Sequence, residues 1–180
     1  MAAVLAVLPP LRNLLEGSLI AHVLLQIPML ILAGASAGRA LPAAWQHAYG
    51  RADPLGWISL LVALFTLAFW LLPRNLDLAV SDPQFAWLKY MSLFIMAGIL
   101  LGLGGPRLPS LACHFLWTNA AAMLLLMGWL YSVAPVRLCT NYLISEQDQL
   151  ATALLMLGAL ALLSFMFSLL TGGLYKERNN

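Results

Sequence analysis

Five long runs of apolar residues restrict the folds that this 180-residue sequence can adopt. A helix that crosses a bilayer needs about 20 mostly apolar residues, and spans end where charges, proline and glycine gather. Barrel strands would instead alternate apolar and polar residues. The sequence therefore predicts an all-α integral membrane bundle of five transmembrane helices. The five predicted spans are residues 17–36, 55–72, 85–103, 110–134 and 148–174.

The composition agrees with lipid as the surroundings of the fold. Hydrophobic residues make up 62% of the chain and charged residues only 9%, whereas about a quarter of a soluble domain is charged. Membrane lipid is therefore an expected partner. The formal net charge of +2, without a cluster of lysine and arginine, does not favour nucleic acid. We expect residues 1–180 to form a single transmembrane domain.

The basic residues indicate an orientation. Five spans place the two termini on opposite sides of the membrane, and positive charge favours the cytoplasmic side. Five of the nine basic residues lie on the side that holds the C-terminus. We therefore expect the N-terminus outside and the C-terminus in the cytoplasm. The five are Arg39, Arg51, Arg107, Lys176 and Arg178.

Polar residues interrupt the first predicted span at helical spacing. Arg12 and Glu16 lie four residues apart, as do His22 and Gln26, and at 100° per residue all four lie within about a third of the helix circumference. An ionisable group within a span is a functional candidate, so His22 is a candidate metal ligand or proton carrier that Gln26 would orient. His and Gln also join transmembrane helices by hydrogen bonds, and for Gln26 this structural role is favoured. In either case His22 should face protein.

Two further stretches contain candidate residues. Cys139 lies near Arg137 and Asn141 in the loop after the fourth span, on the predicted outer side. A thiolate near a cation can bind Cu(I), although for a lone cysteine the role of a small, partly buried apolar residue is favoured. Arg137 and Asn141 are expected to cap and anchor this loop. In the fourth span, His114 and Asn119 are expected to make structural polar contacts between helices.

The sequence lacks the patterns of common catalytic sites. It contains no glycine-rich phosphate loop, no His-Glu-x-x-His helix and no Ser/His/Asp set on one helix face. Acidic residues are also missing from the span interiors, where ion antiport would need them. We therefore expect a protein that is not an enzyme. The small-residue stretch "AGASAG" permits close helix contacts without indicating the partner helix.

Two stretches together resemble a known family. "HVLLQIPMLILAG" and the later "LFTLAFWLLP" are similar to the CtaG family, membrane proteins associated with cytochrome c oxidase assembly. The resemblance covers about a third of the chain. It departs from the family in a shorter His–Pro spacing, in Gln26 following the histidine, in missing histidines and in fewer spans. The matching positions are His22, Pro28, Leu30, Gly34 and residues 69–73.

The resemblance implies an accessory or assembly protein of a bacterial haem–copper respiratory oxidase in the inner membrane, aiding maturation of a copper centre. Copper is then the implied cofactor and oxidase subunits are the implied partners. Only His22 is carried over from a family position, and Glu16 and Cys139 are added as metal ligands from the predicted topology. Two alternatives stay open: a structural supernumerary subunit without metal, and a small transporter or quinone-interacting protein.

Overall fold

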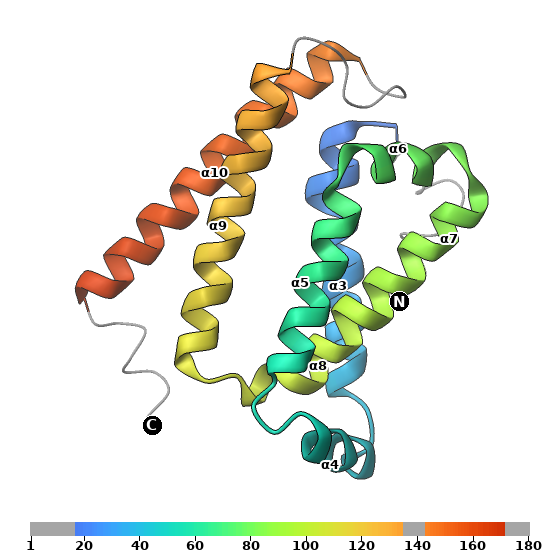
Figure 1. Ribbon diagram of the computed structural model, residues 1–180, viewed down its shortest axis with the longest axis vertical. Helices are drawn as coiled ribbons and strands as arrows, with labels where there is room; N and C mark the ends of the chain where they lie inside the picture. The colour runs from blue at the N-terminus through green and yellow to red at the C-terminus, as the bar shows by residue number, and fades with distance from the viewer. Residues whose placement is uncertain (1–16, 135–142, 172–180) are drawn as a thin grey trace.

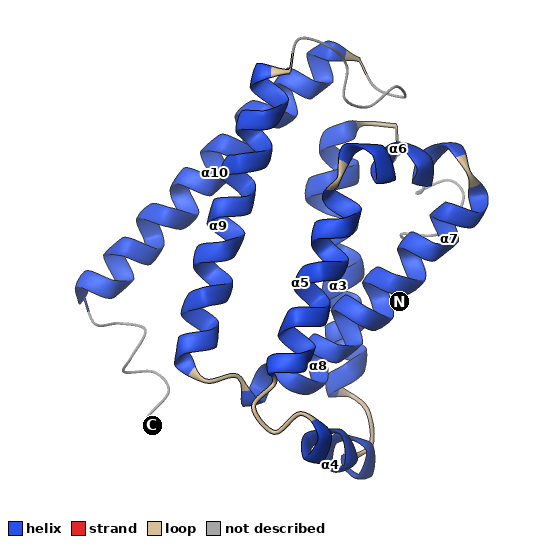
Figure 2. Ribbon diagram, viewed as in Figure 1, coloured by secondary structure: helices blue, strands red, loops and turns tan. Residues whose placement is uncertain are grey.

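The computed structural model describes residues 17–134 and 143–171, and these ranges form helices joined by short turns, without strands (Figures 1 and 2). The protein is an all-α bundle, and within the described ranges four of its helices are long and apolar enough to cross a membrane, or five if the bent pair α4–α5 counts as one span. The elements in chain order are η1 (Ala21–Gln26), α3 (Ile27–Arg39), α4 (Ala43–Ala52), α5 (Trp57–Leu71), α6 (Pro73–Ser81), α7 (Pro83–Ser92), η2 (Leu93–Ile99), α8 (Leu100–Gly104), η3 (Gly105–Arg107), α9 (Ser110–Val133) and α10 (Ile144–Thr171).

The second predicted span differs most from the structure. Residues 55–72 correspond to α5, whose 15 residues make a helix about 22 Å long, shorter than the roughly 30 Å hydrocarbon core. The helix α4 meets α5 at an angle of 89°. The turn between them uses Gly56 at φ +72°, a left-handed conformation that favours glycine. The 37–54 connection, which composition predicted as a loop, therefore contains a helix that lies across the end of the bundle (Figure 1).

The third helix is longer than predicted because proline and aspartate start it early. Pro83 occupies its first turn, and the Asp82 carboxylate accepts a hydrogen bond from the Gln84 backbone N–H at 2.8 Å. Both features favour helix initiation. The helical segment then continues through α7, η2 and α8 to Arg107, whereas the sequence predicted a span over 85–103. The preceding connection is also helical, since α6 begins at Pro73.

Glycines bring the first helix, made of η1 and α3, into backbone contact with the third helix, made of α7, η2 and α8. Gly34 and Gly38 on α3 form one Gly-x-x-x-Gly pattern, and Gly98 and Gly102 on η2 and α8 form another. A Cβ atom added to Gly98 would lie 2.7 Å from the Gly34 Cα atom. Such small-residue patterns let helix backbones approach closely in membranes. The partner of "AGASAG" is therefore a helix of this same chain.

The helices α9 and α10 form a hairpin beside α5 and α3 (Figure 1). Gly128 on α9 lies against the Ala151 carbonyl and Leu155 of α10, so this pair also approaches closely. The Gln147 side chain donates to the Tyr131 carbonyl at 3.1 Å, and the Trp117 indole donates to the Ala161 carbonyl at 3.0 Å. These two bonds tie the hairpin together near both of its ends.

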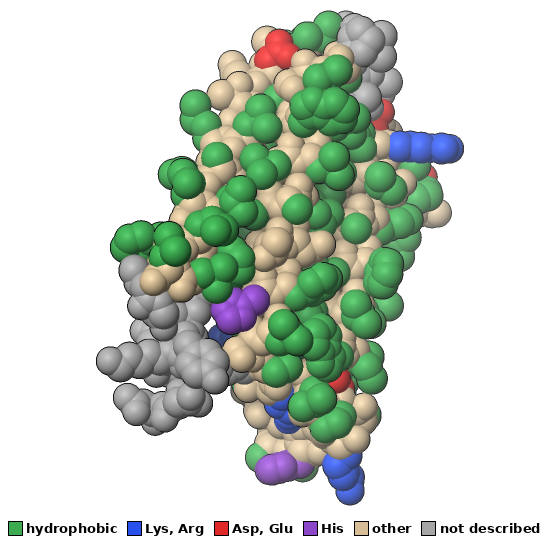
Figure 3. All heavy atoms as spheres, turned by 60° about the vertical axis from the view of Figure 1, so that its left-hand side comes forward, with side chains coloured by type: hydrophobic (Ala, Val, Ile, Leu, Met, Phe, Trp, Pro, Cys, Tyr) green, Lys and Arg blue, Asp and Glu red, His purple; other side chains and the backbone are tan. Residues whose placement is uncertain are grey.

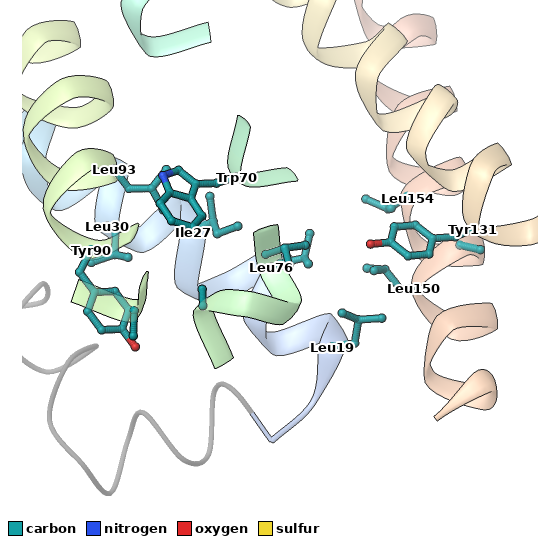
Figure 4. Close-up of a cluster of buried hydrophobic side chains, with 14 residues drawn as sticks. Leu19, Ile27, Leu30, Trp70, Leu76, Tyr90, Leu93, Tyr131, Leu150 and Leu154 are labelled. Carbon is teal, nitrogen blue, oxygen red and sulfur yellow. The ribbon is translucent and has the colours of Figure 1, made fainter. Parts of the chain in front are cut away.

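One cluster of buried apolar residues joins both groups of helices. Figure 4 shows Leu19 and Leu76 facing Leu150 and Tyr131 of the hairpin, while Trp70 lies near Leu93. Outside this cluster the helices expose large apolar side chains, as hydrocarbon surroundings require. Figure 3 shows such side chains along the length of one face, with charged residues mostly toward its ends. This distribution is that of a multi-pass membrane protein.

The glycine contact predicts a specific sensitivity to one added methyl group. Gly98→Ala should lower the free energy of unfolding by about 1–3 kcal/mol, because the new Cβ meets backbone atoms that cannot move aside. The measurement is a reversible SDS titration in mixed micelles. Gly105→Ala is the matched control, since nothing lies within 4 Å of a Cβ atom added there. Equal stabilities of the two variants would contradict the close contact.

Candidate functional site

Three polar side chains meet inside the bundle, between the first and third helices. The Lys89 Nζ atom of α7 lies 2.8 Å from the His22 Nε2 atom and donates to the Gln26 Oε1 atom at 3.1 Å. All three side chains are 0% exposed. We call these three residues the Lys–His–Gln cluster. It is a buried polar group in the part of a membrane protein where such groups are costly to insert.

The local backbone places two of the three residues. His22 and Gln26 both belong to η1, a π-helical turn that runs directly into α3. A second π-helical segment, η2, begins four residues after Lys89 and packs against α3. Short π-helical turns inside α-helices are rare and frequently mark functional sites. The cluster thus lies within a π-helical turn on the first helix and one turn before a π-helical segment on the third.

Aromatic and apolar side chains surround the lysine. Ala86, Tyr90 and Leu93 are buried on the same face of the third helix. The Tyr90 ring centroid lies 4.8 Å from Lys89 Nζ, which is within the range of a cation–π interaction. Nearby, the buried Trp70 of α5 donates its indole N–H to the Ser92 hydroxyl at 2.7 Å and ties α5 to α7.

One hydrogen-bonding pattern of the imidazole follows if the Lys89 amine is protonated. A protonated lysine has only hydrogen-bond donors, so His22 Nε2 accepts from it. In this pattern a neutral imidazole would carry its proton on Nδ1. The Gln26 side-chain carbonyl oxygen accepts a second hydrogen bond from the lysine amine, so both of these acceptors of Lys89 belong to the first helix. The arrangement can therefore hold a cation between two helices, and it orients the imidazole.

The described residues around His22 do not fit a copper ion. Among residues 17–134 and 143–171, no three His, Cys, Asp or Glu side chains converge as a metal site would require. Copper(I) prefers thiolate, thioether and imidazole ligands. Here the His22 Nε2 atom is instead bound to a lysine amine. Glu16 and Cys139, the other two predicted metal ligands, lie outside the described residues, as do Arg137 and Asn141.

The two polar residues predicted for the fourth span have different surroundings. His114 is half-buried between α9 and α10, with its ring edge-to-face on Phe165 at 5.8 Å between centroids. It lines a cavity of about 340 Å³ together with Cys113 and Trp117. Asn119 is half-buried and lines a different, apolar groove. Within the described part of the chain its amide has no hydrogen-bond partner, so the expected polar helix contact is not made there.

A second polar cluster fastens the bend between α4 and α5. The buried Asp53 carboxylate accepts from the Ser59 hydroxyl at 2.6 Å and from the Ser59 and Ile58 backbone N–H groups. Burial acts to raise the pKa of Asp53, but these hydrogen bonds outweigh burial and hold the pKa below its usual value. The Tyr49 and Ser59 hydroxyls are 2.8 Å apart. This cluster satisfies two of the N-terminal N–H groups of α5, those of Ile58 and Ser59, and is structural.

Sequence reasoning missed Lys89 as a member of the site. The predicted span 85–103 places Lys89 near the start of a helix, whereas the helix begins at Pro83 and Lys89 lies almost two turns inside it. A signal was present in the spacing. Positions 86, 89, 90 and 93 follow the i, i+3, i+4, i+7 pattern of one buried helix face. A lysine in such a pattern indicates a buried cation that needs acceptors on another helix.

Comparison of the chain with models of protein families, with characterised proteins and with solved structures finds no match. The geometry of the Lys–His–Gln cluster and the surfaces of the bundle are therefore the observations on which a functional proposal depends.

The cluster predicts energetic coupling between two helices. His22→Phe and Lys89→Met should each destabilise the protein. A double-mutant cycle should give a coupling energy of about 1–3 kcal/mol, because either single substitution already removes the hydrogen bond between the two side chains and the double variant cannot lose it a second time. The measurement is the free energy of unfolding of the four proteins in mixed micelles. His47→Phe, at an exposed position of α4, is the control partner and should be additive with Lys89→Met. Additivity of His22→Phe with Lys89→Met to within about 0.5 kcal/mol would contradict the bond.

Proposed function

We propose that this chain is a non-enzymatic accessory protein of a larger membrane complex and that it acts through helix contacts with neighbouring subunits. The observation that carries this proposal is the complete burial of the Lys–His–Gln cluster. A transporter or a membrane enzyme presents its ionisable groups to water or to a substrate, but these three side chains are 0% exposed and bind one another. Their chemistry is used to hold α7 against η1.

The outer faces of the bundle support contacts with other membrane proteins. Several large side chains of α10 are more than half exposed, among them Leu163 and Phe167. Such residues face lipid in an isolated chain, and a neighbouring transmembrane helix can replace that lipid. A rigid bundle favours binding to a neighbouring subunit, because helices that are already fixed lose less conformational freedom on association than mobile ones.

The resemblance to the CtaG family supports a haem–copper oxidase of a bacterial inner membrane as the complex, with assembly of the oxidase as the task. The distribution of basic residues supports an orientation with the N-terminus outside. Maturation of the copper centre through His22 is the more specific form of this function. The lysine bound to His22 Nε2 weighs against that form and favours a structural role for His22.

Site-specific photo-crosslinking in native membranes tests the accessory role. A photoreactive residue is placed at the exposed Leu163, and the matched control carries it at Leu154, which is 3% exposed. We expect crosslinks from position 163 to oxidase subunits, and only intrachain products from position 154. Crosslinks to lipid alone at position 163, together with a chain that purifies without any other subunit, would contradict the accessory role.

A metal assay on the same purified protein separates the two forms of the function. If His22 is structural, the wild-type chain retains no stoichiometric copper, and His22→Phe does not change its metal content. One copper per wild-type chain that is lost in His22→Phe would contradict the structural role and support copper-centre maturation.

A further inference from the structure

A groove on the opposite side of the first helix is a separate feature from the Lys–His–Gln cluster. It lies between α3 and α5 on one side and α9 on the other, with a volume of about 390 Å³. Small-molecule sites have volumes of about 300–1,000 Å³. Of the lining side chains, all are apolar except Asn119 and Tyr131. The groove is thus large enough for a small ligand and lies within the membrane-spanning helices.

Asn119 is the unusual member of this lining. Its amide lines the groove and forms no hydrogen bond with any described residue. It lies nine residues after Ser110, the first residue of α9, which is about 14 Å along the helix and near half the depth of a 30 Å hydrocarbon core. An amide without a partner in hydrocarbon is unfavourable by several kcal/mol. An occupant that offers a hydrogen-bonding group at this depth would remove that penalty.

Two common occupants of such a groove do not meet this requirement. The acyl chain of a phospholipid has no polar atom, and its ester groups lie at the membrane interface, about 15 Å from the midplane. A partner helix is too wide, because a helix about 11 Å across would fill 390 Å³ with roughly 4 Å of its length, less than one turn. The remaining occupant is a slender, uncharged, apolar molecule with a polar group partway along it.

We propose that this groove binds an isoprenoid quinone with its ring at Asn119. The Asn119 Nδ2–H group donates to a ring carbonyl of the quinone, and the Oδ1 atom accepts from a hydroxyl of the reduced quinol, so one amide serves both forms. Met123 and Met127 lie four and eight residues further along the same face of α9 and line the groove. Their sulfur atoms make favourable contacts with aromatic rings. The isoprenoid tail lies against the leucines and isoleucines of α3 and α5.

The binding of a quinone does not depend on the proposed partner complex. The groove involves Val23 and Ile27 on one face of the first helix, while His22 and Gln26 face Lys89. An isolated, purified chain is therefore sufficient to test it. Failure of the crosslinking experiment above would leave this binding unaffected.

The test is equilibrium binding of decylubiquinone, a quinone with a ten-carbon tail, to the purified chain in lipid nanodiscs. We expect saturable binding of one molecule per chain. Asn119→Leu should weaken it on the order of tenfold, the effect of about one hydrogen bond. Ala120→Phe, which fills the groove, should abolish it. Ala122→Phe is the matched control, because Ala122 is exposed on α9 outside the groove lining, and its affinity should equal that of the wild type.

A second probe separates a quinone site from a site for any apolar chain. Decylbenzene has the same tail but no carbonyl group, so it should compete weakly and equally in the wild type and in Asn119→Leu. Absence of saturable decylubiquinone binding to the wild type would overturn the proposal. So would equal decylubiquinone affinities of the wild type and Asn119→Leu, which would indicate a site for acyl chains. Asn119→Leu keeps the number of side-chain heavy atoms, so the test stands if Ala120→Phe does not fold.

Discussion

A lysine inside an apolar bundle needs acceptors from another helix, and the structure is arranged around this requirement. Lys89 is fully buried, and its amine is bound by an imidazole and an amide that both come from η1. These bonds fix which face of the third helix meets the first. Further along the same two helices, Gly34 and Gly98 bring the backbones into contact. The polar bonds and the glycine contact therefore specify one register between the helices, which apolar packing alone would leave less strongly defined.

The first helix contacts Lys89 with one face and lines the groove with another. One face presents His22 and Gln26 to Lys89, and the other presents Val23 and Ile27 to the groove beside α9. The groove separates α3 and α5 from the α9–α10 hairpin over part of their length, while the buried cluster around Leu76 and Leu154 joins them (Figure 4). The proposed accessory role uses exposed faces of the bundle such as that of α10, whereas the proposed quinone site uses the groove beside α9.

Much of the fold follows from the sequence, because continuous apolar runs bounded by proline, glycine and charge are sufficient to place membrane helices. The fourth predicted span, residues 110–134, agrees closely with α9. The spacing of His22 and Gln26 also placed both residues on one helix face. The helices α4 and α6 were missed, since each is short and mixed in polarity, and their positions depend on tertiary contacts such as those of Asp53 with Ser59. Lys89 was missed because sequence spacing within one helix does not reveal which other helix supplies its acceptors.

The reactivity of Lys89 is the most direct test of the buried cluster. The chain contains two lysines, Lys89 and Lys176, which fall on separate peptides and can be followed independently by mass spectrometry. The protein in lipid nanodiscs is treated with acetic anhydride, a small uncharged reagent that acetylates free amines. We predict that Lys89 is acetylated at least about ten times more slowly in the folded protein than in the denatured chain, because its amine is buried and hydrogen-bonded. Equal rates in the folded and denatured states would contradict the buried Lys–His–Gln cluster and the helix register that it specifies.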